Sequence, residues 1–228
     1  MAVLRFPVRA TAFACVVLTA SGCSSSPSSP SRTPPLSAGM GTLSQRSALL
    51  TGSNVMAIPG GPPGLTVTTP SRQGALFQDP DPRSPCGARV TLPDFSQGAQ
   101  VQLDAASFVA FQVVVDLPVS EATAFATAWQ KDTRPGCPPF LSKSNTGSSQ
   151  IADLVSPVPM PALADQATGT WSTLNDNGQT VNSYGLVLRT GGRLAFDVLI
   201  APAPLPEVFV VGFAYEAEFK LKGSLGSS

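Results

Sequence analysis

Residues 108–117 read FVAFQVVVDL and form the strongest β-strand signal in the chain. β-Branched and aromatic side chains dominate this segment, and such residues fit the pleated, half-buried surface of a sheet. We therefore predict a central strand here, and the other elements are placed around it.

A helix is predicted directly after this strand, over residues 120–132. Ser120 can cap its first turn, and Glu121 suits the positive end of the helix dipole. The Arg134-Pro135-Gly136 run then ends the helix and presents Cys137. Within the helix, four apolar residues recur at helical spacing and form a stripe. This stripe fits either a ligand shelf or, as we expect, core packing. The four residues are Ala122, Phe125, Ala126 and Trp129.

Three strands joined by tight turns are predicted at 168–174, 179–189 and 193–200. Asn175-Asp176-Asn177-Gly178 and Gly191-Gly192 supply the turns, because their residues tolerate positive φ. The last strand alternates clearly, with Leu194, Phe196 and Val198 on one side and Ala195, Asp197 and Leu199 on the other.

A C-terminal helix is predicted after Pro206. Proline and Glu207 favour a first helical turn, whereas Lys222 and Gly223 suit a last turn and a stop. The run 208–211 would favour a strand if taken alone. The signals at both ends agree on a helix.

The remaining ordered segments are predicted more coarsely. A short helix within 43–58 ends at the Pro-Gly run 59–63, and a short strand follows at 65–69. Residues 141–161 are expected to cross the surface as an extended excursion, anchored by Ile151, Leu154 and Val155. The fold class is therefore α+β: a single domain with a central antiparallel sheet, two amphipathic helices packed on it and one disulfide.

The N-terminus has the layout of a signal peptide over residues 1–22. Arg5 and Arg9 precede the apolar run 10–18, and small residues close it before Cys23. A permanent membrane helix needs about 20 apolar residues, so this run is too short for one.

The stretch Ala20-Ser21-Gly22-Cys23 resembles the lipobox of bacterial lipoproteins, although Ala20 stands where that motif usually has Leu. The resemblance implies a diacylglycerol, with its palmitate-type chains, on Cys23. Ordinary cleavage that leaves a free Cys23 is the alternative, but unpaired exposed thiols are uncommon in oxidising compartments. We expect a protein lipid-anchored to the extracytoplasmic face of the cell membrane. A Ser/Pro-rich flexible tether, 23–41, would then lead to a domain over 42–224.

Cysteine counting points to the same compartment. Of four cysteines, Cys15 leaves with the signal peptide and Cys23 takes the lipid. Cys86 and Cys137 remain and are expected to form one disulfide. A metal pair or a reactive thiol is the alternative, but the chain has no histidine to complete a typical zinc site.

Composition excludes several classes of function. Removing two arginines with the signal peptide leaves 12 basic against 14 acidic residues, a formal charge of −2 that does not attract nucleic acid. The lack of histidine removes the usual general base, and no serine-hydrolase or phosphate-loop motif is present. We can name no catalytic residue, and we expect no enzyme, cofactor or metal.

Two acidic turns suggest weak calcium sites, but ordinary turn chemistry explains both. They are Asp79-Pro80-Asp81 and Asn175-Asp176-Asn177-Gly178.

Several features occur in one familiar order: the tether, Leu49-Leu50-Thr51 before a Pro-Gly turn, the strand-to-helix step ending at Cys137, Arg189-Thr190-Gly191-Gly192, and the C-terminal helix. In this order the chain resembles actinobacterial envelope lipoproteins similar to the mycobacterial PknH-like extracellular sensor domain family, over about 42–223. The resemblance implies an α+β fold with a cleft between sheet and helices, and binding of an unidentified envelope ligand. The second disulfide common in that family is absent, and its tryptophan lies closer to the helix-end cysteine than Trp129 does to Cys137.

Three functional hypotheses follow. The first is a sensor-like domain that binds an envelope glycan, lipid or partner protein. The second is a carrier of hydrophobic lipid molecules, which needs an apolar cavity of roughly several hundred cubic ångströms. The third, an enzyme, lacks a supporting constellation. The residues that could line or simply fill the carrier cavity are Phe196, Phe209, Phe213 and Phe219.

Overall fold

The computed structural model of the chain describes residues 41–68, 84–88, 90–133, 137–143, 149–176 and 179–224. All of them belong to one unit, Leu36–Ser228. Several predicted features lie outside these ranges, namely the signal peptide 1–22, Cys23, the tether up to residue 40, and Asp79-Pro80-Asp81.

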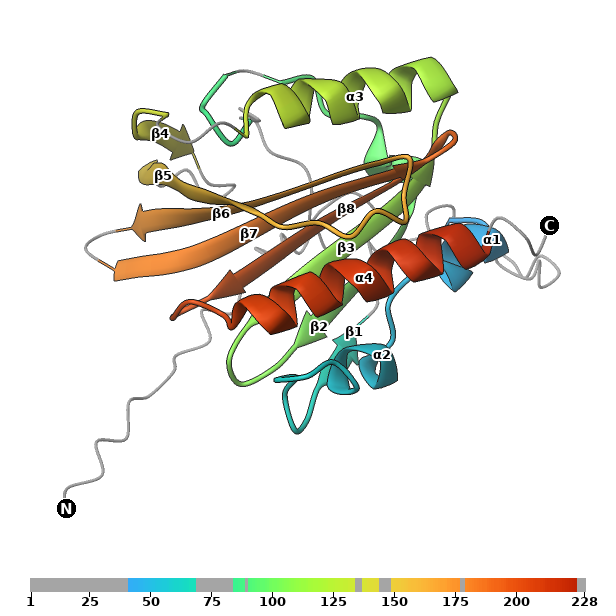
Figure 1. Ribbon diagram of the computed structural model, residues 1–228, viewed down its shortest axis with the longest axis horizontal. Helices are drawn as coiled ribbons and strands as arrows, with labels where there is room; N and C mark the ends of the chain where they lie inside the picture. The colour runs from blue at the N-terminus through green and yellow to red at the C-terminus, as the bar shows by residue number, and fades with distance from the viewer. Residues whose placement is uncertain are drawn as a thin grey trace, which may run out of the picture. The chain divides into compact units, whose positions relative to one another are not determined.

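An eight-stranded antiparallel sheet forms the centre of the domain (Figure 1), with the order β1-β2-β3-β8-β7-β6-β5-β4. Strands β1 to β3 make one half, and strands β4 to β8 make the other. The halves join where β3 pairs with β8, from Val109↔Ile200 to Asp116↔Arg193. The strands are β1 (Thr66–Thr68), β2 (Ala99–Asp104), β3 (Val109–Asp116), β4 (Phe140–Lys143), β5 (Ser149–Val158), β6 (Gln166–Asp176), β7 (Gln179–Thr190) and β8 (Arg193–Ala201).

Two long helices cover opposite faces of this sheet (Figure 1). The helix α3 (Val119–Lys131) links the two halves and packs on β6, β7 and β8. The helix α4 (Glu207–Gly223) packs on β5, β7 and β8 from the other side. Three short helices complete the described domain: α1 (Leu43–Ser47), α2 (Gly52–Met56) and the 3-10 helix η1 (Phe95–Gln97).

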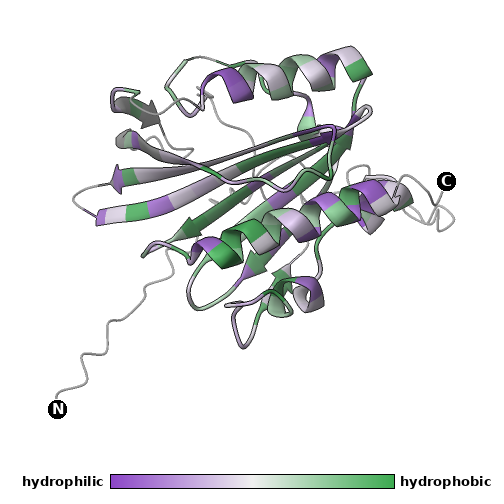
Figure 2. Cartoon of the chain, in the orientation of Figure 1, coloured by the Kyte–Doolittle hydropathy of each residue, from purple (hydrophilic) through white to green (hydrophobic). Residues whose placement is uncertain are grey.

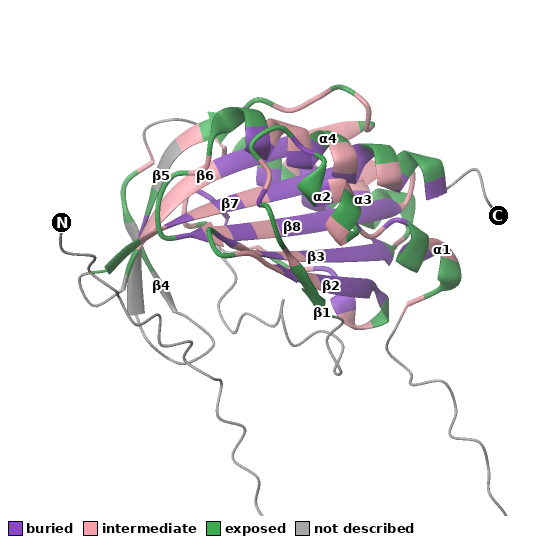
Figure 3. Ribbon diagram, turned by 90° about the horizontal axis from the view of Figure 1, so that it is seen from below, coloured by how far each residue is buried: buried purple, intermediate pink, exposed green. Residues whose placement is uncertain are grey.

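The predicted alternation of β8 is present, and it separates two hydrophobic cores. Leu194 and Phe196 pack with the α3 stripe that includes Phe125 and Trp129. Ala195 and Leu199 belong to the core beneath α4. The central strands are apolar and buried along most of their length (Figures 2 and 3). Core packing, rather than a ligand shelf, is therefore the role of the aromatic stripe on α3.

The predicted α+β class is confirmed, and so are the central strand, both long helices and the three hairpin strands. The predicted cap of α3 is wrong. Pro118 occupies the N-cap position and no side chain caps the helix, because Ser120 already lies inside the first turn. Proline is compatible with this position since its fixed φ suits the entry to a helix.

The predicted helix within 43–58 is two helices, because Ala48–Thr51 forms a turn between them. Thr42 and Thr51 each accept a hydrogen bond from a backbone N–H three residues on, so each starts its own short helix. Leu50, Val55 and Ile58 are buried, whereas Met56 is exposed.

The predicted surface excursion over 141–161 is also wrong, because this segment contains β4 and β5. Both strands lie at the end of the sheet, where polar residues and proline are tolerated. The side chains of its three predicted anchors lie outside the described part of the structure. Strand β2 is a further element that the sequence pattern did not indicate.

Candidate functional site

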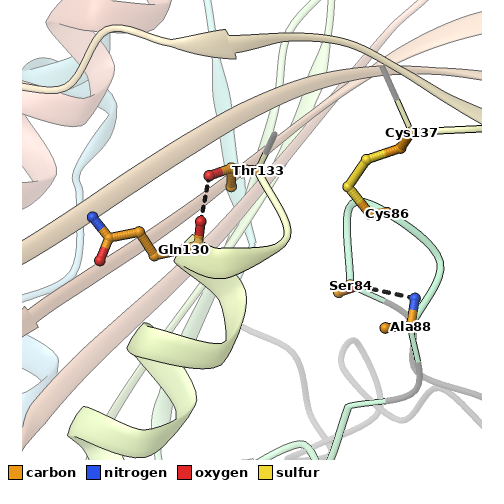
Figure 4. The surroundings of a disulfide bond; sticks show 6 residues. All are labelled: Ser84, Cys86, Ala88, Gln130, Thr133 and Cys137. Carbon is orange, nitrogen blue, oxygen red and sulfur yellow. Dashed lines mark hydrogen bonds between the residues drawn. A yellow bond between two sulfur atoms is a disulfide. The ribbon is translucent and has the colours of Figure 1, made fainter. Parts of the chain in front are cut away.

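The predicted cysteine pair is joined. Cys86 and Cys137 form a disulfide with their Cα atoms 5.2 Å apart, which ties the 84–88 loop to the segment after α3 (Figure 4). Each partner segment is also held locally, because Ser84 Oγ accepts the Ala88 N–H and Thr133 Oγ1 donates to the Gln130 carbonyl. This disulfide therefore links two segments whose cysteines are 51 positions apart in the sequence.

The four phenylalanines that could line or fill a carrier cavity do not form one group, although Phe209 and Phe213 are neighbours on α4. Phe196 lies on the α3 face of the sheet. Phe209 and Phe213 are 1% and 0% exposed within the opposite core, and Phe219 is 60% exposed. The two buried residues on α4 thus fill the interior rather than line a cavity.

A pocket does open beside the first turns of α4, with a volume of about 140 Å³. It lies between α4, the last residues of β5 and the middle of β6 and β7. Seven of its ten lining residues are apolar or indole. The full lining is Ser156, Pro157, Val158, Pro159, Trp171, Tyr184, Pro204, Leu205, Glu207 and Val210. We call it the Trp171 pocket.

Strand register explains why the hollow forms here. Ser156, Trp171 and Tyr184 are successive cross-strand partners on β5, β6 and β7. Trp171 stacks on Tyr184 with ring centroids 6.1 Å apart and planes inclined by 10°. The cross-strand partner of Trp171 on its other side is the small Ser156, which leaves room beside the indole. A register shift in β5 just before Ser156 sets this alignment.

Hydrogen bonds fix both rings. Trp171 Nε1 donates to Asn182 Oδ1 at 3.0 Å, and the Tyr184 hydroxyl accepts the Leu205 N–H at 2.8 Å. Burial raises the pKa of Tyr184, and the hydrogen bond from Leu205 offsets part of that rise. Tyr184 is therefore neutral at physiological pH and can still donate its own proton.

A loop that begins at Pro159 borders the pocket, and a side chain of α4 is hydrogen-bonded to the backbone of this loop. Glu218 Oε2 accepts hydrogen bonds from the N–H groups of Leu163 and Ala164 at 2.8 and 3.1 Å. Burial of Glu218 raises its pKa, and the two backbone donors oppose this rise. Glu218 thus anchors to α4 the loop that leads away from Pro159.

Among the described residues that line the pocket, Glu207 is the single charged one. It stands in the first turn of α4, where the helix dipole favours a carboxylate. The pocket therefore combines aromatic and apolar walls with a carboxylate and two hydroxyl groups, which suits binding through stacking and hydrogen bonds.

A second hollow of about 320 Å³ lies between residues 90–93 and α3, and it is lined by Glu121, Ala124, Phe125 and Ala128 on the helix side. It is wider but has no fixed pair of aromatic rings. No group of three or more metal-ligating side chains occurs in the described ranges. Of the predicted calcium turn, Asn177 and Gly178 fall outside those ranges.

Sequence reasoning missed the Trp171 pocket. Trp171 and Tyr184 occupy predicted hairpin strands, and their separation of 13 positions reveals their pairing only once the register is known. Pro204 and Leu205 reach the site from a third segment. The one available signal was a tryptophan outside any predicted core stripe.

No protein-family model matches the chain, and no curated protein matches it. Among solved structures, the chain is similar to the extracellular domain of PknH from Mycobacterium tuberculosis, with 14% identity and a TM-score of 0.48. The similarity covers 78% of this chain and 94% of that one. No helix in the described ranges is both long enough and apolar enough to cross a membrane.

Proposed function

We propose that this chain is an extracytoplasmic, lipid-anchored and non-catalytic binding protein that holds an envelope ligand in the Trp171 pocket. One observation motivates this function: two stacked aromatic rings are fixed by hydrogen bonds beside an open, largely apolar pocket. Rigid walls favour binding, because little conformational entropy is lost when a ligand enters.

The proposed location is supported by the disulfide and by the N-terminal sequence. Disulfides persist in oxidising compartments, and Cys86 and Cys137 form one. The signal-peptide layout and the lipobox-like Ala20-Ser21-Gly22-Cys23 lead to the same compartment.

A binding role is also favoured over transport of a whole lipid. Pockets that enclose drug-sized ligands measure about 300–1,000 Å³, and the Trp171 pocket is smaller, at about 140 Å³. It suits one group of a larger ligand, with the rest of that ligand outside the protein.

Native mass spectrometry of protein purified from its own envelope tests the binding function. We expect a co-purifying ligand on the wild type and its loss from Trp171→Ala. Phe219→Ala is the matched control, because Phe219 is an exposed aromatic residue elsewhere on α4. A ligand retained by Trp171→Ala at the wild-type level would place binding elsewhere.

Metabolic labelling with radioactive palmitate tests the anchor. We expect label on the wild-type protein and none on Cys23→Ala, because the lipid would be attached through that thiol. Cys15→Ala should be labelled like the wild type, since Cys15 lies in the predicted signal peptide. Equal labelling of wild type and Cys23→Ala would reject the anchor.

A further inference from the structure

We infer that the Trp171 pocket takes the ring of a neutral pyranose sugar, stacked against the side of the indole that faces β5. This inference rests on the proposed binding function and names its ligand class. The sugar would be one residue of a larger envelope glycan, because the pocket has room for a single ring.

The stacking surface follows from the cross-strand row. Tyr184 occupies one side of Trp171, and the small Ser156 is its partner on the other side. A ring above Ser156 would therefore continue the stack in place of a third large side chain. The C–H face of a pyranose is apolar and fits against an aromatic ring, whose face is slightly negative.

The size of the pocket also fits one ring. An apolar cavity of about 150 Å³ in another protein holds a benzene molecule, and the Trp171 pocket measures about 140 Å³. A six-membered sugar ring can enter, and its hydroxyl groups can point to the open mouth.

The polar groups of the lining favour a ligand that brings hydrogen-bond donors. Covering the Glu207 carboxylate with a purely apolar group would remove its water without replacement, and that desolvation is costly. Sugar hydroxyls can donate to Glu207 and can exchange hydrogen bonds with Ser156 and Tyr184. None of the ten lining residues that the structure describes is cationic, so an anionic sugar or a fatty-acid carboxylate would be repelled by Glu207 without compensation.

A quaternary ammonium group is the strongest competitor, because it would satisfy Glu207 and could contact an aromatic face. Such cations are bound best when several ring faces surround them. Here the rings of Trp171 and Tyr184 are stacked nearly parallel, so they do not converge on one point as the walls of an aromatic cage do. This arrangement favours a flat ring over a spherical cation.

Saturation-transfer NMR on the folded protein tests the inference with four probes: methyl glucoside, methyl galactoside, choline and dodecanoate. We expect transfer to the C–H protons of at least one glycoside, with a dissociation constant of about 1 mM. Tryptophan fluorescence gives a second readout. The chain has two tryptophans, so Trp129→Phe leaves Trp171 as the only tryptophan, and the bound sugar should shift the tryptophan emission excited at a wavelength that tyrosine does not absorb.

Three variants test whether the glycoside binds in the Trp171 pocket. Trp171→Ala should abolish transfer to the glycoside, and Glu207→Gln should weaken binding several-fold. Glu216→Gln makes the same charge change on α4, outside the pocket lining, and should bind like the wild type. Circular dichroism confirms that each variant is folded before it is compared.

The outcomes separate the ligand class from the binding function. Choline or dodecanoate bound more tightly than both glycosides, with loss in Trp171→Ala, would overturn the sugar assignment and leave the pocket as a binding site. Glycoside binding that survives Trp171→Ala would overturn the assignment of the sugar to this pocket. Glycoside binding that is lost in Trp171→Ala and weakened in Glu207→Gln would support both the sugar assignment and the binding function of the pocket.

Discussion

Gln112 of β3 and Asp197 of β8 are direct cross-strand partners, and both are 0% exposed. Gln112 Oε1 accepts the Leu50 N–H at 2.7 Å, which ties the turn between α1 and α2 to the sheet. Within the described residues, neither Asp197 carboxyl oxygen has a hydrogen bond of ordinary geometry. Burial raises the pKa of Asp197 well above its ordinary value, and the nearby Gln112 amide opposes that rise only in part.

The stability of the protein should therefore fall as pH rises through the folded pKa of Asp197. The folded state binds this proton more tightly than the unfolded state, so the stabilisation is complete below the unfolded pKa of about 3.9 and is lost above the folded pKa. Asp197→Asn should remove this dependence and be more stable than wild type at neutral pH by at least about 1 kcal/mol. Urea denaturation at a series of pH values measures both effects.

Asp153→Asn is the control for this titration, because Asp153 is exposed on β5. Its stability should follow the wild-type pH curve. Parallel curves for wild type and Asp197→Asn would show that the buried carboxyl does not control the pH dependence.

Gly212 allows α4 to approach Ile58, just after α2, closely. A Cβ atom at this position would collide with Cγ2 of Ile58. Gly212→Ala should therefore destabilise the protein by roughly 1–3 kcal/mol, even though alanine has the higher helix propensity. Gly223→Ala is the matched control, because a Cβ there meets no atom within 4 Å. Thermal unfolding should show a loss for the first variant only. The additional loss caused by Gly212→Ala should be smaller when it is introduced into an Ile58→Ala background than into the wild type.

Arg193 fastens β8 to β3 and to the end of α4. Its guanidinium binds both Asp116 oxygens at 2.7 and 3.1 Å and donates to Ser224 Oγ at 2.8 Å, while the residue is only 6% exposed. Arg193→Ala should cost about 2 kcal/mol of unfolding free energy, because bonds to a charged group are lost in a largely buried place. Arg46→Ala, at an exposed arginine, should change it by no more than about 0.5 kcal/mol. Equal losses in the two variants would refute the fastening role.

The disulfide should contribute measurably to stability. It closes a separation of 51 positions, for which the chain-entropy model gives about 4 kcal/mol. Replacing Cys86 and Cys137 together by alanine should lower the unfolding free energy by roughly 2–4 kcal/mol, as measured by guanidinium denaturation. A reductant should lower the unfolding free energy of the wild type by the same amount, and it should leave the unfolding free energy of the double variant unchanged.

The sequence pattern predicted the elements whose signals are local. Residues 108–117 are apolar and β-branched, and the ends of α4 have both a proline start and a glycine stop, so both elements are where they were expected. Strand β2 was missed because glutamines break its apolar pattern, although Gln100 is buried. Strand β5 was missed because proline and serine resemble a loop until β6 pairs with them.

The candidate site could not be predicted for a related reason. The hollow exists because the small Ser156 stands opposite Trp171, and that pairing depends on a register shift in β5. The buried Asp197 is a second example. Its alternation with Phe196 and Val198 predicted the side of the strand on which it lies, but not that Gln112 would be its neighbour.

The junction between β3 and β8 also has a consequence for the order of folding. Asp116 and Arg193 meet across it although they are 77 positions apart, and contacts between such distant residues form slowly because a long loop must close first. Until β8 arrives, β3 keeps one edge unpaired and rich in valine. Such an edge invites pairing with another chain, so a chain truncated before residue 193 should aggregate rather than remain a smaller folded domain.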